Sequence, residues 1–457
     1  MIKIHEDIFY PIYEYLYLFV MVIYMAQMTP ETGRMVGGLS GNPIPLLIPI
    51  VMTVILLVRN PISFNHRKLW TFAGIMLCWS AAVCYKFHDF SSSNLSYYVF
   101  LFYAIFIAFV HIRVYGRDLF LLYEHIMVVF AAISLVLWGV AVLAPPDMNF
   151  FRMFPETGFG NNVLYLFNWM DPVKGQIYET LIRNAGCSWE PGRYSIMLVS
   201  AILINLSREG ITFRNNRKVI ILLLALASTM STTGYSITFL LYVIFSFREV
   251  NAKSILSFLL IALPLAIFIF SFDFMGDKIL ERANFEGLTR ERMHNINYNA
   301  KIHGEEYLGS MDRFESAYFD WINFQKEPML GYGRNNNHSW FCQDISRNFA
   351  LSGGFVKVFA QYGIFIGLLL YALLFYSSIK ISRTCWVRQR YAFAIALLVS
   401  SISYPVFGIP LFTAFWLYGL FGYEEDELPS EDADLAYEDA DYADEDDEGY
   451  EGSEVND

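Results

Sequence analysis

The run LFLLYEHIMVVFAAISLVLWGVAVL, residues 119–143, decides the fold class. Only Glu124 and His125 in this run can carry a charge near neutral pH. An α-helix rises about 1.5 Å per residue, so about 20 apolar residues cross the hydrocarbon core of a bilayer. The run therefore predicts a transmembrane helix rather than a helix of a soluble domain.

Similar apolar runs before and after it predict about twelve transmembrane helices in total. The composition agrees, because 55% of the 457 residues are hydrophobic and only 17% are charged, against about 25% charged in soluble domains. The first run has no basic start and no small-residue cleavage site, so we expect a retained helix rather than a signal peptide. The predicted spans are 11–28, 44–58, 69–85, 95–112, 119–143, 193–207, 217–230, 234–247, 254–272, 360–379, 391–404 and 408–423.

Charge is distributed unevenly along the chain. Between Glu424 and Asp457 there are 18 Asp and Glu residues and no Lys or Arg, which leaves 32 basic and 26 acidic residues in the first 423. The net charge of −12 therefore reflects the tail and not the body. Such a tail cannot bury enough apolar area to order itself, so 424–457 predicts a disordered acidic tail. Docking of the tail to a basic partner is the alternative.

The basic residues of the connections orient the predicted helices. With the N-terminus in the cytoplasm, the cytoplasmic connections hold 15 Lys and Arg residues, whereas the four short connections opposite hold only Arg34 and Lys86. Basic residues near helix ends stay on the cytoplasmic face, so both termini are predicted to be cytoplasmic. The cytoplasmic connections are 59–68, 113–118, 207–218, 248–253 and 380–390.

Two long loops, about 144–192 and about 273–353, then fall on the outer, periplasmic side. Loops of this length in a compact domain are usually functional or disordered, and their aromatic and charged residues favour order. We therefore expect an all-α polytopic membrane domain over residues 1–423, with two long, partly helical periplasmic loops.

The predicted helices contain few charges. Glu14 and the pair Glu124 and His125 lie near cytoplasmic ends, where side chains can snorkel to the surface. Ion-coupled transporters usually carry ionisable residues near the membrane midplane. This pattern therefore disfavours a transporter.

The five cysteines suggest no metal site, because no pair has metal-ligand spacing. Cys78 and Cys84 share one predicted helix, and Cys385 lies in a cytoplasmic connection. Cys187 and Cys342 each lie in one of the two outer loops, so an oxidising compartment could join them in a disulfide. We expect no metal and no other cofactor.

The segment GCSWEPGRYS, residues 186–195, leads from the first long loop into an apolar helix. Pro191 suits a first helical turn, and Glu190 stands at the N-terminus, where a carboxylate is favourable. One interpretation is a helix cap beside Arg193. The other is a polar pocket at the outer surface, because helix N-termini also bind anions. Arg183, seven residues before Glu190, could belong to this pocket.

The second long loop contains a further set of candidate binding residues. Phe314, Tyr318 and Trp321 recur at helical spacing. Each of these features also has a structural alternative. For Gly331, Tyr332 and Gly333 it is a simple turn, and for His338 it is a solvated loop histidine. For the arginines it is binding to lipid headgroups. The basic and aromatic candidates are Arg290, Arg292, His294, Arg313, Tyr332, Arg334 and His338, with Lys357 further on.

The order of several short motifs resembles a known family. These are Arg183-x-x-Gly186-x-x-Trp189-Glu190-Pro191-Gly192, STTGY at 231–235, Pro-x-x-Gly-Tyr-Gly at 328–333 before an Asn and His cluster, and QYGIFIGLLL at 361–370. Together they are similar to the bacterial O-antigen and capsule polymerases of the Wzy type, in the O-antigen ligase/polymerase superfamily. The resemblance spans roughly residues 70–420.

The resemblance implies transfer of glycan from an undecaprenyl-pyrophosphate carrier on the periplasmic face of the bacterial inner membrane, with inversion at the sugar. Guanidinium groups would stabilise the pyrophosphate leaving group, and the apolar helices would hold the polyprenyl chain. Glu190 or His338 would be the general base for the acceptor hydroxyl. The arginine pool is Arg183, Arg193, Arg290, Arg292, Arg313 and Arg334, and loop aromatics such as Tyr332 would stack on sugars.

Three functions remain open at this point. The first is a polysaccharide polymerase, for which the resemblance also implies a chain-length regulator as partner. The second is a surface-glycan ligase with the same chemistry, although ligases tend to have Asn after the histidine and here Ser339 follows His338. The third is a non-catalytic lipid-glycan transporter or flippase. We expect the lipid-linked glycan and the bilayer, and no nucleic acid, as partners.

Overall fold

The computed structural model describes the chain in several ranges, and all structural statements below refer to them. They are 11–27, 44–143, 161–163, 167–170, 181–188, 190–211, 216–246, 313–344, 354–384, 389–401 and 407–422. The predicted span 254–272, the acidic tail 424–457 and the residues Arg290, Arg292 and His294 lie outside them.

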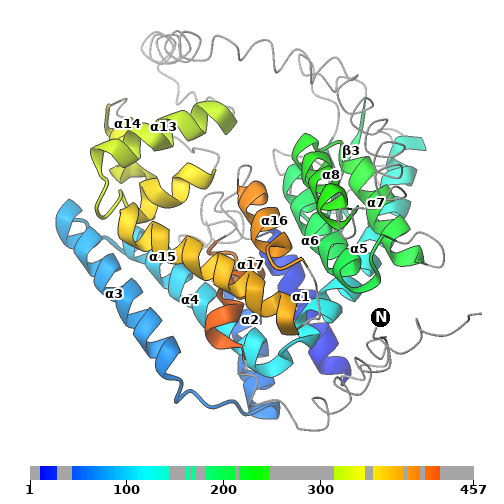
Figure 1. Ribbon diagram of the computed structural model, residues 1–457, viewed down its shortest axis with the longest axis horizontal. Helices are drawn as coiled ribbons and strands as arrows, with labels where there is room; N and C mark the ends of the chain where they lie inside the picture. Colours follow the sequence, from blue (N-terminus) through cyan, green and yellow to red (C-terminus); the bar gives the residue numbers. More distant parts are fainter. Residues whose placement is uncertain are drawn as a thin grey trace, which may run out of the picture.

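Helices make up nearly all of the described structure (Figure 1). The N-terminal helices are α1 (Ile12–Gln27), α2 (Ile44–Arg59), α3 (Arg67–Phe87), α4 (Ser92–Tyr115) and α5 (Asp118–Leu143). The middle helices are α6 (Pro191–Glu209), α7 (Arg217–Thr229) and α8 (Thr232–Ser246). The later helices are α13 (Arg313–Lys326), the 3₁₀ turn η5 (Asn336–His338), α14 (Trp340–Asp344), α15 (Phe355–Thr384), α16 (Ala392–Ser401) and α17 (Pro410–Phe421).

A small antiparallel sheet precedes α6 and was not predicted. Its strands β1 (Asn161–Val163), β2 (Phe167–Met170) and β3 (Arg183–Gly186) lie in the order β1-β2-β3. Asn162 of β1 pairs with Asn168 of β2. The first long loop is therefore partly strand, whereas the helix predicted in the second loop is confirmed as α13.

The helices have the apolar character of a membrane-embedded protein. Among the described helices, α3, α4, α5 and α15 are long and apolar enough to cross a membrane, and α1, α2, α8, α16 and α17 contain shorter apolar stretches. Large apolar side chains remain exposed on the long helices, such as Val99, Val136 and Phe365, each about two-thirds exposed. Exposed apolar surface of this extent is suited to lipid. The predominantly helical fold is confirmed, and four of the described helices are long and apolar enough to cross a membrane, while the membrane topology and the number of full crossings stay predictions.

The helix α6 is the centre of one half of the molecule. Its side chains are buried from Pro191 to Leu206, and β3, α5, α7 and α8 pack around it. The other half is built from α4, α15 and α17, with α3 and α13 beside them. The helix α16 contacts both α15 and the pair α6 and α8, so it joins the halves (Figure 1).

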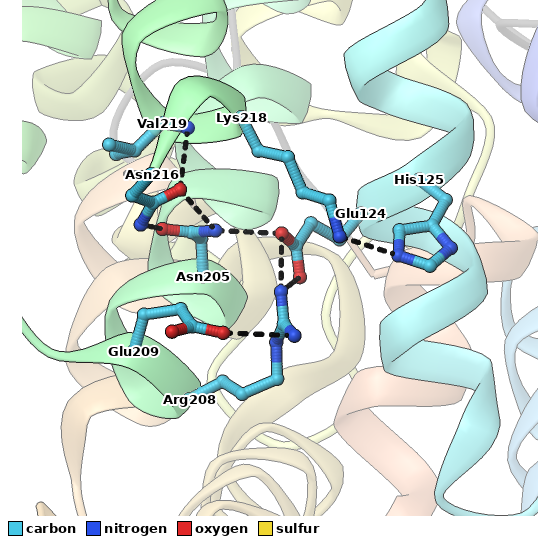
Figure 2. Close-up of polar contacts among 8 residues, drawn as sticks. All are labelled: Glu124, His125, Asn205, Arg208, Glu209, Asn216, Lys218 and Val219. Atoms are coloured by element: carbon cyan, nitrogen blue, oxygen red, sulfur yellow. Dashed lines mark hydrogen bonds and ion pairs between the residues drawn. The ribbon is translucent and has the colours of Figure 1, made fainter. Parts of the chain in front are cut away.

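The expectation that Glu14 and Glu124 snorkel to the surface is wrong. The exposed fraction is 2% for Glu14 and 0% for Glu124. Figure 2 shows the Glu124 carboxylate between Asn205, which donates at 2.7 Å, and Arg208, whose Nη2 lies 3.2 Å from Oε1. A buried charge is retained when it is paired and hydrogen-bonded, and here the partner is supplied by the end of α6 rather than by water.

The same network extends to α7. Asn216 donates to Asn205 at 2.8 Å and accepts from the backbone N–H of Val219 at 3.2 Å (Figure 2). Asn216 is thereby the N-cap residue of α7, and a capping asparagine satisfies one of the unpaired N–H groups of a first turn. Lys218 of α7 lies 3.0 Å from Nε2 of His125 on α5. Side-chain contacts therefore hold α5, α6 and α7 together at one end.

Candidate functional site

The first cluster of candidates, Arg183, Glu190 and Arg193, lies where β3 enters α6. Glu190 is the N-cap residue with extended backbone angles (φ −141°, ψ 136°), but its side chain makes no capping hydrogen bond. The cap interpretation therefore holds for its position and not for its carboxylate. Arg193 is only 2% exposed. The Nε atom of Arg183 donates to the carbonyl of Thr229 at 3.2 Å, so this side chain contacts the C-terminal end of α7.

Two motifs of the family resemblance meet on α6. Gly186 packs directly on the ring of Tyr194, since a Cβ atom there would lie 2.2 Å from the ring. Ser195 donates to Ser231 at 2.8 Å, and a Cβ atom at Gly234 would lie 2.7 Å from that of Ser195. The segments 186–195 and 231–235 are therefore packed together, and their small residues are required by this close approach.

Cys187 and Cys342 do not form the disulfide that the sequence allowed. Cys187 directly follows β3 and Cys342 lies in α14, and Figure 1 shows β3 and α14 at opposite sides of the molecule. Burial raises the pKa of Cys187 to about 12. The thiol is therefore neutral at pH 7 and packs as a small apolar side chain.

Two further motifs pair in the other half. Tyr332 N–H donates to the carbonyl of Ala360 at 2.9 Å, and Gly333 N–H donates to that of Gln361 at 3.0 Å. The helix α15 is interrupted at Gly363 (φ 71°, ψ 179°), a backbone region that is nearly restricted to glycine. The 328–333 motif thus pairs through its backbone with the break in α15. It is more than the simple turn considered above, and the span predicted at 360–379 is a longer, broken helix.

The second cluster of candidates, Tyr332, Arg334 and His338, continues from this pairing. Tyr332 is only 1% exposed, so it packs in the interior. Arg334 donates from Nη1 to the hydroxyl of Tyr362 at 3.0 Å. Arg313 begins α13, and Lys357 is completely buried on α15.

A residue that was not predicted, Asp89, lies opposite this cluster in the connection from α3 to α4. The helix α3 ends because His88 adopts the left-handed conformation (φ 50°). Asp89 then accepts the backbone N–H of Ser91 at 3.1 Å. Ser91 in turn caps α4 by accepting the N–H of Asn94 at 3.2 Å. This local geometry is an Asx turn followed by an N-cap, and it fixes the position of the Asp89 carboxylate.

His338 and Asp89 form a hydrogen-bonded pair. Nε2 of His338 lies 2.8 Å from Oδ2 of Asp89, and Asn335 donates to the same oxygen at 3.3 Å. The imidazole also stacks on Phe87, with ring centroids 4.5 Å apart and planes 9° apart. Lys86 forms an ion pair with Glu327. The end of α3 and the second long loop are therefore locked together around the histidine.

The electrostatics of the pair determine which nitrogen carries the proton. Burial opposes ionisation of Asp89, but the hydroxyl and N–H of Ser91 and the contact with His338 hold the pKa of this carboxyl below its usual value. An ionised carboxylate only accepts, so Nε2 of His338 is the donor. In neutral imidazole Nδ1 is then the acceptor. Nδ1 is buried and has no hydrogen-bond partner among the described residues.

The structure does not bring the two clusters together. In Figure 1, β3 and α6 lie at one side, α13 and α14 at the other, and α16 lies between them. His338 therefore contacts Asp89, and not Glu190. The sequence signal for Asp89 was weak, because an acidic residue two positions before a run of three serines is typical of an ordinary turn. Searches against family models and against curated proteins find no match for this chain.

Proposed function

We propose that this protein is a membrane-embedded glycosyltransferase that polymerises undecaprenyl-pyrophosphate-linked repeat units into a surface polysaccharide. The observation that carries the proposal is the pair of Asp89 and His338. A histidine whose one nitrogen is held by a carboxylate has its other nitrogen ready to accept a proton. Attack of a sugar hydroxyl on a glycosyl pyrophosphate requires such a base.

In this proposal His338 takes the proton of the acceptor hydroxyl at Nδ1, and Asp89 stabilises the imidazolium that forms. The hydroxyl oxygen forms the new glycosidic bond while the bond from the sugar to the pyrophosphate breaks, with inversion at the sugar carbon. Because Nδ1 is buried, the acceptor reaches it only when covering residues move aside, as in other enzymes that close over substrate. Glu190, half-buried at the start of α6, is the second candidate base.

The leaving pyrophosphate would be stabilised by guanidinium groups, which bind phosphate oxygens in bidentate fashion. Arg334 is the described arginine nearest in sequence to His338, and Arg183 and Arg193 serve the other cluster. Arg290, Arg292 and Arg313 complete the proposed pool. Tyr332 supports the pairing at α15 and is proposed to contact sugar only if it becomes uncovered.

The proposal includes the cell location. We infer the bacterial inner membrane, about twelve crossings, cytoplasmic termini and periplasmic long loops, on the basis of the basic connections. The partners are the lipid-linked glycan, as donor and acceptor, and a chain-length regulator. The ligase is retained as the alternative because its chemistry is the same, and the lipid-glycan flippase as the second alternative.

The glycan profile of a deletion strain tests the proposal. One repeat on lipid A-core indicates the polymerase, whereas full-length glycan stranded on carrier lipid indicates the ligase. In the complemented strain, His338→Gln should reduce long-chain glycan by about 10²- to 10⁴-fold, the usual contribution of a general base. Glu190→Gln and Arg193→Ala are expected to abolish long chains if the first cluster also acts.

A matched control, His88, lies next to Asp89 in the connection from α3 to α4. His88 is exposed and left-handed, and asparagine tolerates this conformation, so His88→Asn should leave the glycan ladder unchanged. Equal protein levels on a membrane immunoblot are required for each comparison. Normal ladders from both His338→Gln and Glu190→Gln would overturn the catalytic proposal and favour the flippase.

A further inference from the structure

A pocket lies between the end of α2, the turn that follows it and the last turn of α4, whereas Asp89 lies before the start of α4. Its volume is about 390 Å³, and Arg59, the turn 60–63, Arg113 and Val114 line it. Two guanidinium groups from different helices thus share one opening with the polar Asn60 and Ser63. Arginines paired in this way match the oxygens of a phosphate group.

The position of Arg59 is fixed by buried partners. Its Nε donates to Oε1 of Glu14 at 3.1 Å, and Asn60 donates to the same oxygen at 3.1 Å. The guanidinium also lies 5.3 Å from the ring centroid of Tyr13. These two contacts of Arg59 use its Nε atom and one face of the guanidinium. Glu14 therefore orients Arg59, which lines the pocket.

An exposed apolar stripe on α2 leads to this pocket. Its members are spaced as one face of a helix and end at Arg59, with exposed fractions from 39% to 77%: Ile50, Val51, Val54, Ile55 and Val58. After the turn, Trp70 is 63% exposed and donates its indole N–H to the carbonyl of Phe64 at 2.8 Å. An exposed tryptophan near the end of an apolar segment is typical of a membrane–water interface.

The pocket and the pair of Asp89 and His338 are separated by the length of α4. Asp89 lies just before this helix of 24 residues, and Arg113 lies in its last turn. At about 1.5 Å per residue the helix spans about 36 Å, compared with about 30 Å for a hydrocarbon core. The helix α4 is therefore long enough to place the pocket and the pair at opposite surfaces of one bilayer.

We propose that this pocket binds the phosphate-bearing headgroup of an anionic phospholipid, with its acyl chains along the exposed face of α2. A basic pocket between helices at a membrane surface is suited to such headgroups. The exposed apolar stripe on α2 suits the acyl chains of such a lipid. A soluble phosphate compound has no acyl chains and would not require this stripe. This inference does not depend on the proposed glycosyltransferase activity.

The test uses the full-length protein in a neutral detergent and a fluorescent-acyl phosphatidylglycerol, with phosphatidylcholine of the same chain as reference. The wild type should bind the phosphatidylglycerol at least about tenfold more tightly, since each arginine near an anionic surface contributes on the order of fivefold or more. Arg59→Gln combined with Arg113→Gln should remove this preference. Arg217→Gln, an exposed arginine at the start of α7, should retain it.

Loss of Arg59 leaves Glu14 buried without its cation, so the double variant could unfold. Arg113→Gln alone keeps that ion pair and should still lower the preference, with size-exclusion chromatography confirming the folded state. Excess inorganic phosphate should not displace the lipid. An equal affinity for both lipids in the wild type, an unchanged preference in Arg113→Gln, or displacement by inorganic phosphate would each overturn the proposal.

Discussion

At the scale of single residues, the contact of Asp89 with His338 depends on a few local interactions. The left-handed His88 ends α3, and the Asx turn with Ser91 aims the carboxylate at the second long loop. His338 reaches this carboxylate from 249 positions further along the chain. The pair is a tertiary contact rather than a sequence motif.

The lowered pKa of Asp89 predicts a pH-dependent contribution to stability. Its folded-state pKa lies below the unfolded value of about 3.9. The stabilisation is therefore fully present above the unfolded pKa and is lost as the pH falls through the folded pKa. Asp89→Asn should destabilise the protein by about 1 to 3 kcal/mol at pH 7, and this difference should shrink below about pH 4.

Thermal unfolding in detergent, followed by tryptophan fluorescence at a series of pH values, measures the difference between wild type and Asp89→Asn. His88→Asn provides the control, because its exposed side chain is not part of the contact. A difference that grows on acidification would contradict the assigned direction.

The sequence was informative at this scale for one member of the pair only. His338 was a candidate because it followed a glycine turn and an asparagine cluster in a long loop. Asp89 was missed because nothing in FHDFSSSN distinguishes a functional carboxylate from a turn residue. The burial of individual side chains could not be predicted from the sequence either. Arg193 and Tyr332 were expected to face substrate, but both are almost completely covered.

At the scale of elements, the short motifs act in pairs. The segment 328–333 pairs with the break in α15, and the segment 186–195 packs on 231–235. In each pair, glycine allows two backbones or a backbone and a side chain to approach. The motifs of the family resemblance therefore have a packing role that accounts for them without reference to catalysis.

This role predicts a sharp contrast between glycines. A Cβ atom at Gly363 would lie 2.0 Å from the carbonyl oxygen of Met329, whereas at Gly139 of α5 nothing lies within 4 Å. Gly363→Ala should cost more than about 2 kcal/mol, and Gly139→Ala should stabilise by about 0.5 to 1 kcal/mol. The apparent melting temperatures of the purified variants measure both effects.

An unchanged melting temperature in Gly363→Ala would show that α15 can close its break. The hydropathy of QYGIFIGLLL predicted a continuous span because a single glycine is tolerated within a helix. Only the backbone partner at 328–333 explains why the helix is broken there. Sequence periodicity thus located α15 but not its interruption.

At the scale of the whole molecule, apolar runs were sufficient to predict a helical membrane protein. They were not sufficient to predict which helices face lipid, because a buried helix and a lipid-facing helix are both apolar. The helix α6 was predicted as a span of the same kind as α5, yet it is enclosed by its neighbours. The three strands before it lacked a signal because each is four residues or shorter.

The pair of Asp89 and His338 and the proposed lipid pocket are separated by the length of α4. This separation predicts that the two ends of α3 and α4 are accessible to reagents from opposite sides of the membrane. Ser92 and Asn65 are both exposed, one near each end. With the orientation proposed above, Ser92→Cys should react with a membrane-impermeant maleimide in intact cells. Asn65→Cys should react only after the inner membrane is permeabilised.

The wild type, which keeps the exposed Cys78 on α3, measures the background labelling. The reverse pattern would invert the proposed orientation, and labelling of both cysteines in intact cells would argue against a membrane between them.

The enclosure of α6 has a consequence for biogenesis. This helix carries Arg193, Asn205 and Arg208, and it is not among the described helices that could cross a membrane on their own apolarity. Charged groups of an inserting helix cost free energy unless they are paired, and those of α6 lie near its two ends, with Arg193 in the first turn and Arg208 in the last. The compensation comes from Glu124 on α5, made earlier by the ribosome, and from Asn216 at the start of α7, made just afterwards. We therefore expect α6 to leave the translocon only as part of a group with these two helices, and an isolated α6 that inserted efficiently would contradict this order of assembly.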